Sequence, residues 1–177
     1  MKTKLLSAAI VAGAAIASQS AFASDGTITF NGALTAQTCD ISSSIGGKDF
    51  TVVLPTVSTS TLNAAGQTAG DSAFSIQLTN CTPDSGPVRT QFEAGSTVNA
   101  NGRLVQQTGT AANVEIQLLN GDGSIIKAGD PVASQGSKPT TIASGAATLP
   151  YIGRYFATGA TTAGTVNSYV TYSIAYQ

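Results

Sequence analysis

Apolar and polar residues alternate over several short runs of this sequence. The alternation is clear in residues 74–80 and 113–119, whose apolar positions are Phe74, Ile76, Leu78, Val114, Ile116 and Leu118. A period of two residues is typical of a strand that is buried on one face. Gly, Pro, Asn and Ser interrupt the runs, and from Thr51 onward no long stretch has the 3.6-residue period of a helix. The chain is therefore predicted to be all-β.

The connections between these runs are polar. Asn120–Gly123, with the sequence NGDG, is typical of a hairpin turn and is soon followed by the apolar pair Ile125 and Ile126. Residues 58–72, rich in Thr, Ser, Ala and Gly, are predicted to form turns or short helices. The segment around Ser134–Lys138, bracketed by two prolines, is predicted to be a surface loop.

Residues 25–34, with the sequence DGTITFNGAL, also alternate like a strand. Ile28, Phe30 and Leu34 share one face, but Gly32 interrupts that face. On the alternation alone, this run is the first strand of a closed sandwich, with a bulge at Gly32.

The last twelve residues carry a longer apolar face. One parity of residues 166–177 holds Val166, Ser168, Val170, Tyr172, Ile174 and Tyr176, and the chain ends at Gln177. A strand with such a face must find neighbours in a sheet. Whatever pairs beside this strand is therefore expected to matter for stability.

Residues 1–23 are typical of a secretory signal peptide. Lys2 and Lys4 precede a short apolar run, and Ala21-Phe22-Ala23 has the small-x-small pattern of a cleavage site. The run is too short for a membrane span of about 20 residues, so no membrane insertion is expected. Removal of this segment leaves 177 − 23 = 154 residues, which suits one domain.

Charge and composition exclude several classes of function. Without its first 23 residues the chain has 6 basic and 9 acidic side chains, a net charge of −3, and no basic patch for nucleic acid. It contains no histidine, which removes Ser-His and Cys-His nucleophile activation and the commonest metal ligand. The few acidic residues are scattered. We therefore expect neither catalysis nor a cofactor.

Two local motifs leave alternatives open. Asn120, Asp122 and Asp130 are candidate calcium ligands, but their spacing departs from the EF-hand loop, and an ordinary hairpin turn is the more frequent use of such a sequence. Asn80-Cys81-Thr82 matches a glycosylation acceptor, although a bridged cysteine in the motif argues against modification.

Cys39 and Cys81 are the two cysteines of the chain. In an exported protein an oxidising compartment favours their pairing, so a disulfide is predicted. The alternative, two free buried thiols, is less favoured because both lie near the ends of predicted strands.

Several motifs occur together with the signal peptide and the DGTITFNGAL run. They are Gln37-Thr38-Cys39, Leu54-Pro55, Phe74-x-Ile-x-Leu-x-x-Cys81, Asn113-x-x-Ile116-x-Leu118-Leu119, Arg154-Tyr155-Phe156-Ala157-Thr158, Gly164 and the penultimate Tyr176. In this combination the sequence resembles the chaperone-usher pilins of Gram-negative bacteria, particularly the major subunits of type 1-like and F17-like fimbriae. The spacing from Gly164 to Tyr176 is a hallmark of these pilins.

This resemblance implies an incomplete immunoglobulin-like sandwich that lacks its last strand. Residues 37–177 would form the pilin domain, with an open groove beside the strand at Val166–Gln177 that includes Val170, Tyr172, Ile174 and Tyr176 and follows Gly164. A periplasmic chaperone would first lend a strand and hold the carboxylate of Gln177. Residues 24–36 of the next subunit would then replace the chaperone strand.

In that scheme Ile28, Phe30 and Leu34 would fill pockets of the neighbouring subunit, and Gly32 would lie where the pocket is shallow or already filled. The implied function is a structural subunit that passes through the periplasm and an outer-membrane usher, then polymerises into the rod of a surface fimbrium carrying a tip adhesin. Alternatives are a minor adaptor subunit, a tip-associated receptor-binding module or a secreted enzyme. A tip adhesin normally places a lectin domain before the pilin domain, and this chain has the length of one domain.

Overall fold

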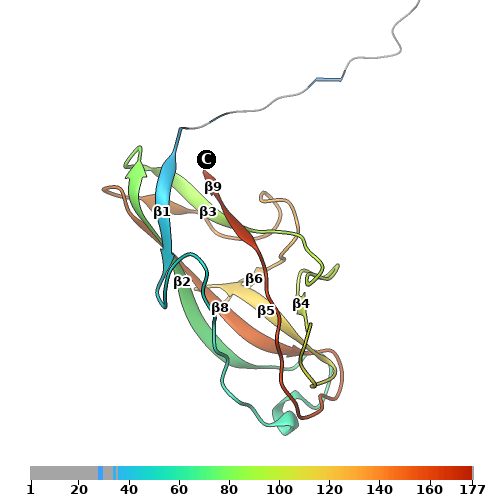
Figure 1. The fold of residues 1–177 in the computed structure, drawn as a ribbon. Helices are drawn as coiled ribbons and strands as arrows, with labels where there is room; N and C mark the ends of the chain where they lie inside the picture. Colours follow the sequence, from blue (N-terminus) through green and yellow to red (C-terminus); the bar gives the residue numbers. More distant parts are fainter. Residues whose placement is uncertain (1–27, 30–33, 35, 177) are drawn as a thin grey trace, which may run out of the picture. The chain divides into compact units, whose positions relative to one another are not determined.

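The strands of this protein form two antiparallel sheets (Figure 1). The structure is a computed structural model, and it describes residues 28, 29, 34 and 36–176. One sheet has the order β1 (Thr38–Ser43), β2 (Thr68–Thr82), β8 (Ala147–Ala157), β5 (Val114–Asn120) and β4 (Leu104–Val105), and β6 (Ile125–Ile126) also pairs with β5. The other has the order β7 (Thr140–Ile142), β3 (Gly86–Phe92) and β9 (Tyr172–Tyr176). The predicted all-β class is confirmed.

The chain divides into two units. Leu34–Gln177 is one compact unit and contains every strand of the described residues. Of the first unit, Met1–Ala33, the structure describes only Ile28 and Thr29, which are exposed and belong to no strand. In the part of the chain that the structure describes, no helix is long and apolar enough to cross a membrane.

The core lies between the two sheets and follows the alternation of the strands. Ile76 of β2 and Leu149 of β8 face each other in register and are almost fully buried. From the other sheet, β3 contributes Val88 and Phe92 to the same apolar cluster. Each such side chain stabilises the fold by about 1.5–3 kcal/mol on burial. The predicted strands at 74–80 and 113–119 are thus confirmed as parts of β2 and β5.

The predicted disulfide joins Cys39 of β1 to Cys81 at the end of β2. It lies beside the paired residues Thr38 and Thr82, so it fastens the first strand of the sheet to its neighbour. Within the possible glycosylation motif, Cys81 is therefore bridged, and the Asn80 side chain donates a hydrogen bond to Asp40 at 2.8 Å.

The connections differ in part from the sequence-based expectations. The predicted hairpin turn at Asn120–Gly123 is confirmed, because it joins β5 to β6. Residues 58–72 do include a short 3-10 helix, Thr59–Leu62, but from Thr68 onward they already belong to β2. The segment around Ser134–Lys138 is a loop, yet Gln135 and Ser137 are almost fully buried. The prediction of a surface loop is therefore wrong for these two residues.

Candidate functional site

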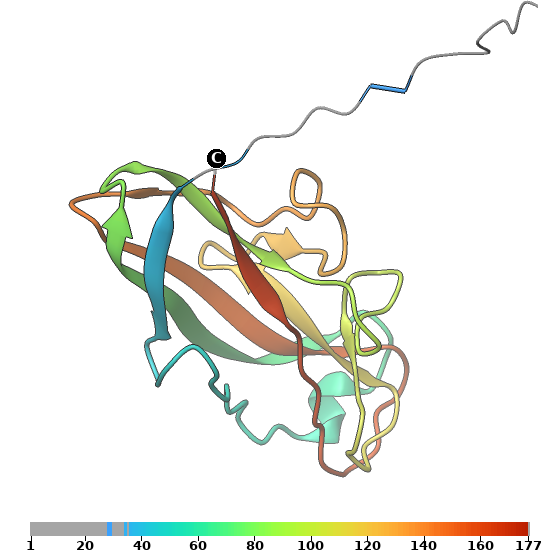
Figure 2. The same cartoon turned by 45° about the horizontal axis from the view of Figure 1, so that its top comes forward.

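A groove of about 670 Å³ runs along one side of the sandwich. Its two walls are the segments 48–54, which follows β1, and 166–172, which leads into β9. Figures 1 and 2 show these two segments beside the lower parts of β2 and β8. The groove is therefore a gap between two lengths of chain that are distant in the sequence.

The wall formed by residues 166–176 keeps the alternation of its sequence. The even-numbered residues Val166, Ser168, Val170, Tyr172 and Ile174 are half-buried, whereas the odd-numbered residues between them are exposed. Only Tyr172–Tyr176 is a strand, although a strand was expected from Val166. The reason is that the backbone carbonyls of this stretch are hydrogen-bonded to loop residues and not to a strand. Thr165 O accepts from Thr110 N (2.9 Å), Asn167 O from Gln107 N (2.8 Å), Tyr169 O from Thr97 Oγ1 (2.7 Å) and Thr171 O from Glu93 N (2.9 Å).

These contacts leave one backbone edge of the wall unpaired. All four acceptors are carbonyls of odd-numbered residues, and backbone groups of successive residues in an extended chain point to opposite sides. The N–H and C=O groups of Val166, Ser168 and Val170 therefore point towards the groove. Above them, β9 pairs with β3 and is the last strand of its sheet among the described residues.

The opposite wall has the same character. Phe50, Val52 and Leu54 are half-buried, while Thr51 and Val53 between them are exposed, Val53 by 81%. This segment belongs to no strand of the described residues. The sequence-based prediction included only the end of this wall, the Leu54-Pro55 motif, because the apolar Val53 interrupts the alternation in the sequence.

Two side-chain contacts fasten the second wall. The Val53 carbonyl accepts a hydrogen bond from Ser72 Oγ of β2 at 3.2 Å. At the upper end of the groove, Tyr172 Oη donates to the carbonyl of Lys48 at 2.8 Å and so joins the two walls. The ring of Phe50 lies 6.3 Å from that of Tyr172. The two walls are thus joined beside the start of β9.

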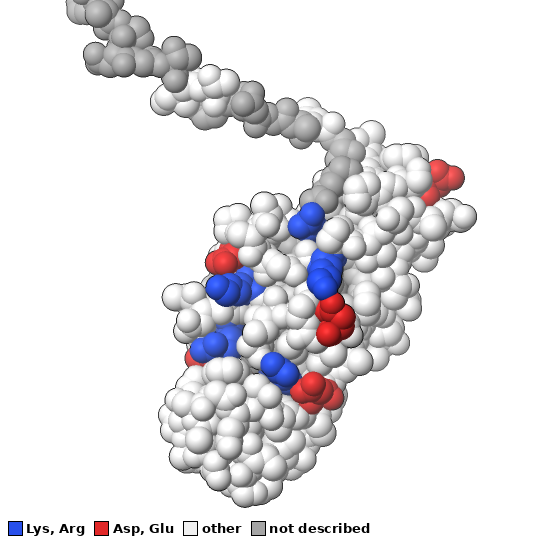
Figure 3. Space-filling view, turned by 180° about the vertical axis from the view of Figure 1, so that it is seen from behind, with Lys and Arg blue, Asp and Glu red and all other residues white. Residues whose placement is uncertain are grey.

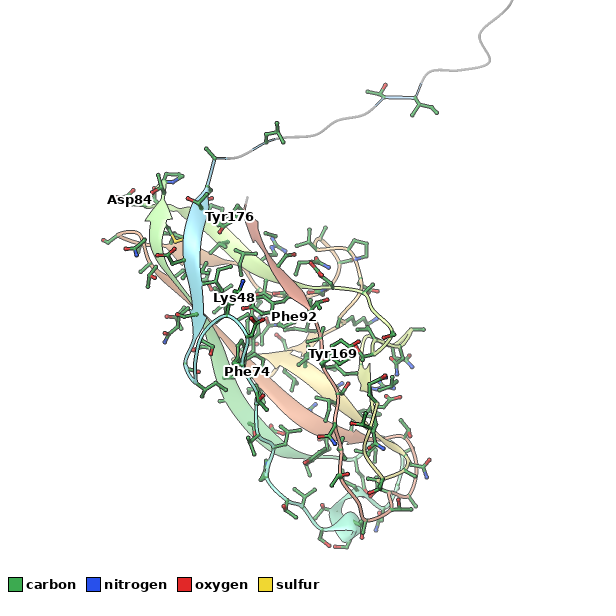
Figure 4. All side chains as sticks on the ribbon, viewed as in Figure 1. Lys48, Phe74, Asp84, Phe92, Tyr169 and Tyr176 are labelled. Carbon is green, nitrogen blue, oxygen red and sulfur yellow. A yellow bond between two sulfur atoms is a disulfide. The ribbon has the colours of Figure 1, made fainter. Side chains whose placement is uncertain are left out.

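The floor of the groove is the face of the core that lies beneath the gap between the two walls. It is formed by Phe74 and Ile76 of β2, Phe92 of β3, Leu104 of β4, Ile116 and Leu118 of β5, and Gly153 and Tyr155 of β8. Figure 4 shows Phe74 and Phe92 between the segments that carry Lys48 and Tyr169. A channel with apolar side chains beneath and free backbone groups along both walls has the geometry that accepts an extended peptide strand.

Gly164 holds the lower end of the first wall against a neighbouring loop. A Cβ atom at this position would lie only 2.4 Å from the backbone nitrogen of Ala111 and 2.5 Å from Thr110 Oγ1. Glycine is therefore required for this close approach of two backbones. Thr165, the next residue, accepts hydrogen bonds from Thr110 N and Ala111 N.

The remaining predicted site residues divide into two sets. Ile28 and Leu34 are described, and their side chains are exposed by 81% and 104%. Phe30, Gly32 and Gln177 lie outside the described residues.

Burial changes the pKa of two tyrosines that line the groove and of Tyr176 in β9. Burial raises the pKa of Tyr155, and burial together with the nearby charge of Asp49 raises that of Tyr172. The pKa of Tyr176 is also raised by burial, against a smaller opposite effect of a hydrogen bond from the Cys39 backbone. The phenols at this site are therefore neutral at physiological pH.

Charged side chains lie mostly away from the groove and close to partners of opposite sign. Figure 3 shows Lys and Arg next to Asp and Glu on the rear face. Arg103 Nε pairs with Glu115 Oε2 at 2.5 Å, and the guanidinium lies 4.0 Å from the centre of the Phe156 ring. Such interspersed charges make no field of one sign that would attract a polyanion.

The turn considered for calcium uses its polar atoms internally. Asn120 Oδ1 accepts a hydrogen bond from Lys138 N at 2.9 Å, and its Nδ2 donates to Gly136 O and Ser124 O. Hydrogen bonds from Lys138 and Ser124 hold the pKa of the exposed Asp122 well below its usual range. Within residues 28–29, 34 and 36–176, no group of three or more His, Cys, Asp or Glu side chains is arranged to hold a metal ion.

Comparison with known proteins adds a consistent set of relatives. The family model FimA, described as type-1 fimbrial protein, A, matches residues 54–177. The major fimbrial subunit SMF-1 of Stenotrophomonas maltophilia is 47% identical over 169 residues, which cover 92% of this chain and 98% of that protein. The F17 fimbrial protein of Escherichia coli is 40% identical over 171 residues, which cover 93% of this chain and 94% of that protein.

The fold has a counterpart among solved structures. A subunit in the structure of a chaperone-usher pilus superimposes with a TM-score of 0.58 and 23% identity, over 87% of this chain and 96% of that one. At this level of identity the likeness concerns the fold, and it places the open sandwich described above among pilin folds.

Proposed function

Since this chain belongs to the family of type-1 fimbrial proteins and is a structural subunit of a surface fimbrium, we propose that it polymerises into the pilus rod by donor-strand exchange. In this proposal residues 24–36 of one subunit lie in the groove of the next. Residues 1–23 are removed on export to the periplasm, and residues 37–177 form the domain that carries the groove.

The observation that carries this proposal is the pair of unpaired backbone edges on the two sides of an apolar floor. An open edge beside exposed apolar surface promotes association with other strands. A strand inserted between residues 48–54 and 166–172 pairs with both edges and covers the half-buried face of Val170 and Tyr172. Insertion therefore removes both sources of instability at once.

The inserted segment has matching chemistry. Ile28, Phe30 and Leu34 lie on one parity of residues 24–36, so all three can face the groove floor when that segment is extended. Ile28 and Leu34 are exposed. Burial of three side chains of this size contributes about 1.5–3 kcal/mol each.

The groove also suits a temporary partner. The two walls run in opposite directions (Figure 1), so a strand lying between them is parallel to one wall and antiparallel to the other, whichever way it points. Parallel and antiparallel strand pairs both form backbone hydrogen bonds, so the inserted strand can pair with each wall. We propose that a periplasmic chaperone first occupies the groove, with Gln177 at its end, and that subunit exchange takes place at an outer-membrane usher.

The test compares two charged substitutions at neighbouring positions of the donor segment. Phe30→Asp places a carboxylate on the groove-facing parity, whereas the control Thr29→Asp places it on the opposite parity. In cells that produce the complete fimbrial system, the first variant should accumulate as periplasmic subunit without fibres in electron micrographs. The second should form fibres. Normal fibres from Phe30→Asp, or equal loss in both variants, would contradict donor-strand exchange.

A further inference from the structure

A glycine occupies the middle of a central strand of this sandwich. Gly153 lies in β8, paired with Ser72 of β2 on one side and Leu118 of β5 on the other. It is buried, and it belongs to the floor of the groove. Glycine weakens the interior of a strand, because it has no side chain to pack and its backbone loses more freedom on folding. The position therefore needs a reason.

The isolated subunit gives no reason for it. The backbone of Gly153 is not in the left-handed region that favours glycine, and a Cβ atom there would have one heavy-atom neighbour within 4 Å, Leu54 Cδ2 at 3.8 Å. That distance is an ordinary van der Waals contact. Unlike Gly164, which is pressed against another backbone, Gly153 could carry a side chain within its own subunit.

The missing side chain leaves a notch in the groove floor beside Tyr155. Tyr151 and Tyr155 precede and follow Gly153 on the same face of β8. The ring of Tyr151 is packed edge-on against Phe92 at 5.1 Å and is almost fully buried. Tyr155 is half-buried and lines the groove. Along the floor, the absent side chain of Gly153 is therefore followed by the large side chain of Tyr155.

The donor segment has the complementary order. Its groove-facing positions include Phe30, the largest side chain, followed by Gly32. Residues two apart on a strand are separated by about 6.6 Å, on the donor and on β8 alike. With the donor lying along β8 in the same direction, a phenylalanine above the notch places Gly32 near Tyr155, where a larger side chain would collide.

From this match we infer that Gly153 is a specificity-determining residue and that the notch above it receives the Phe30 ring of the neighbouring subunit. The inference rests on the proposed donor-strand exchange and extends it to a particular pair of residues. It also accounts for two glycines at once, since Gly153 makes room for Phe30 and Gly32 makes room for a tyrosine of the acceptor.

The test fills the notch and then trims the incoming side chain. The acceptor is the chain of residues 24–177 with Phe30→Asp, whose own segment cannot fill a groove, and the probe is a labelled peptide of residues 24–36. Adding Gly153→Val should weaken binding of the unmodified peptide by about tenfold or more, as expected for overpacking. On the acceptor without Gly153→Val, the Phe30→Ala peptide should bind more weakly than the unmodified peptide. On the Gly153→Val acceptor, the Phe30→Ala peptide should bind as tightly as the unmodified peptide or more tightly.

A second peptide identifies which side chain enters the notch. The Leu34→Ala peptide should lose the same factor of affinity on both acceptors, because its pocket is elsewhere. The assignment of Phe30 would be wrong if the Leu34→Ala peptide restored binding to the Gly153→Val acceptor. It would also be wrong if neither the Leu34→Ala nor the Phe30→Ala peptide did so. Failure of the unmodified peptide to bind the acceptor with glycine at 153 would instead contradict donor-strand exchange itself.

A milder variant separates specificity from folding. Gly153→Ala adds one methyl group where the bare subunit has room, so the melting temperature of the acceptor should stay the same or rise. Affinity for the unmodified peptide should nevertheless fall. If melting temperature and affinity fall together, Gly153 serves the fold of its own subunit and the inference is wrong.

Discussion

Removal of the disulfide gives a direct test of how this open sandwich is held together. Cys39 and Cys81 are separated by 42 positions in the sequence. On the chain-entropy model, a cross-link that closes a loop of about 43 residues stabilises the folded state by about 4 kcal/mol at 25 °C. Because whole domains are stable by only about 5–15 kcal/mol, replacing both cysteines with alanine should remove a large part of the total.

The assay is equilibrium unfolding in urea, with the parent and the Cys39→Ala, Cys81→Ala variant both carrying Phe30→Asp to prevent polymerisation. With a slope of about 2 kcal/mol per molar urea, the midpoint should fall by about 2 M. The parent treated with a reducing agent should show a similar fall. Midpoints that agree within about 0.5 M would refute the reasoning. A lower urea midpoint in the alanine variant, without a lower midpoint in the parent treated with reducing agent, would also refute it.

Two further predictions concern the floor and the upper end of the groove. Gln135 Oε1 accepts a hydrogen bond from the backbone N–H of Phe92 at 2.9 Å, inside the core. Gln135→Leu should leave that donor unpaired and lower the free energy of unfolding by about 1–3 kcal/mol. The control Gln107→Leu, at an exposed position, should change the free energy of unfolding little, and equal losses in the two variants would contradict the argument. Burial raises the pKa of Tyr155, Tyr172 and Tyr176 in the folded state, so the folded chain holds these protons more tightly and its stability should fall as pH rises above about 10. Ultraviolet titration should show that these phenols ionise at a higher pH than free tyrosine, and at a still higher pH with donor peptide in the groove. Ionisation at the pH of free tyrosine, with and without peptide, would disprove this prediction.

Much of the fold is legible in the sequence because apolar residues recur with the period of a strand. The centres of β2 and β5 and the turn at Asn120–Gly123 follow from short-range patterns alone. The start of β2 does not, because Thr68–Ser72 has no apolar alternation and its pairing with β8 is interrupted by a shift of register between Ala69 and Ser72. Its place is fixed by neighbours far away in the sequence.

The candidate site was predicted on one side only. The even-numbered face from Val166 to Tyr176 stands out because it is long and apolar. The opposite wall, residues 50–54, has four apolar residues that do not alternate with polar ones, because Val53 follows Val52, so its pattern does not mark a half-buried strand. The burial of Gln135 depends on Phe92, 43 residues away, and no local pattern reveals such a contact.

The destabilising features of this subunit are concentrated at one place, and that concentration explains how a marginal domain can build a durable fibre. Elsewhere, Cys39 is bridged and Gln135 satisfies the backbone of Phe92. At the groove, two backbone edges are unpaired, an apolar face is half-covered and Gly153 leaves a notch. In the proposed donor-strand exchange, one inserted strand corrects all of these defects together, so its release must expose them together. A transition that requires so many contacts to break at once has a high barrier, and the polymer persists because opening is slow.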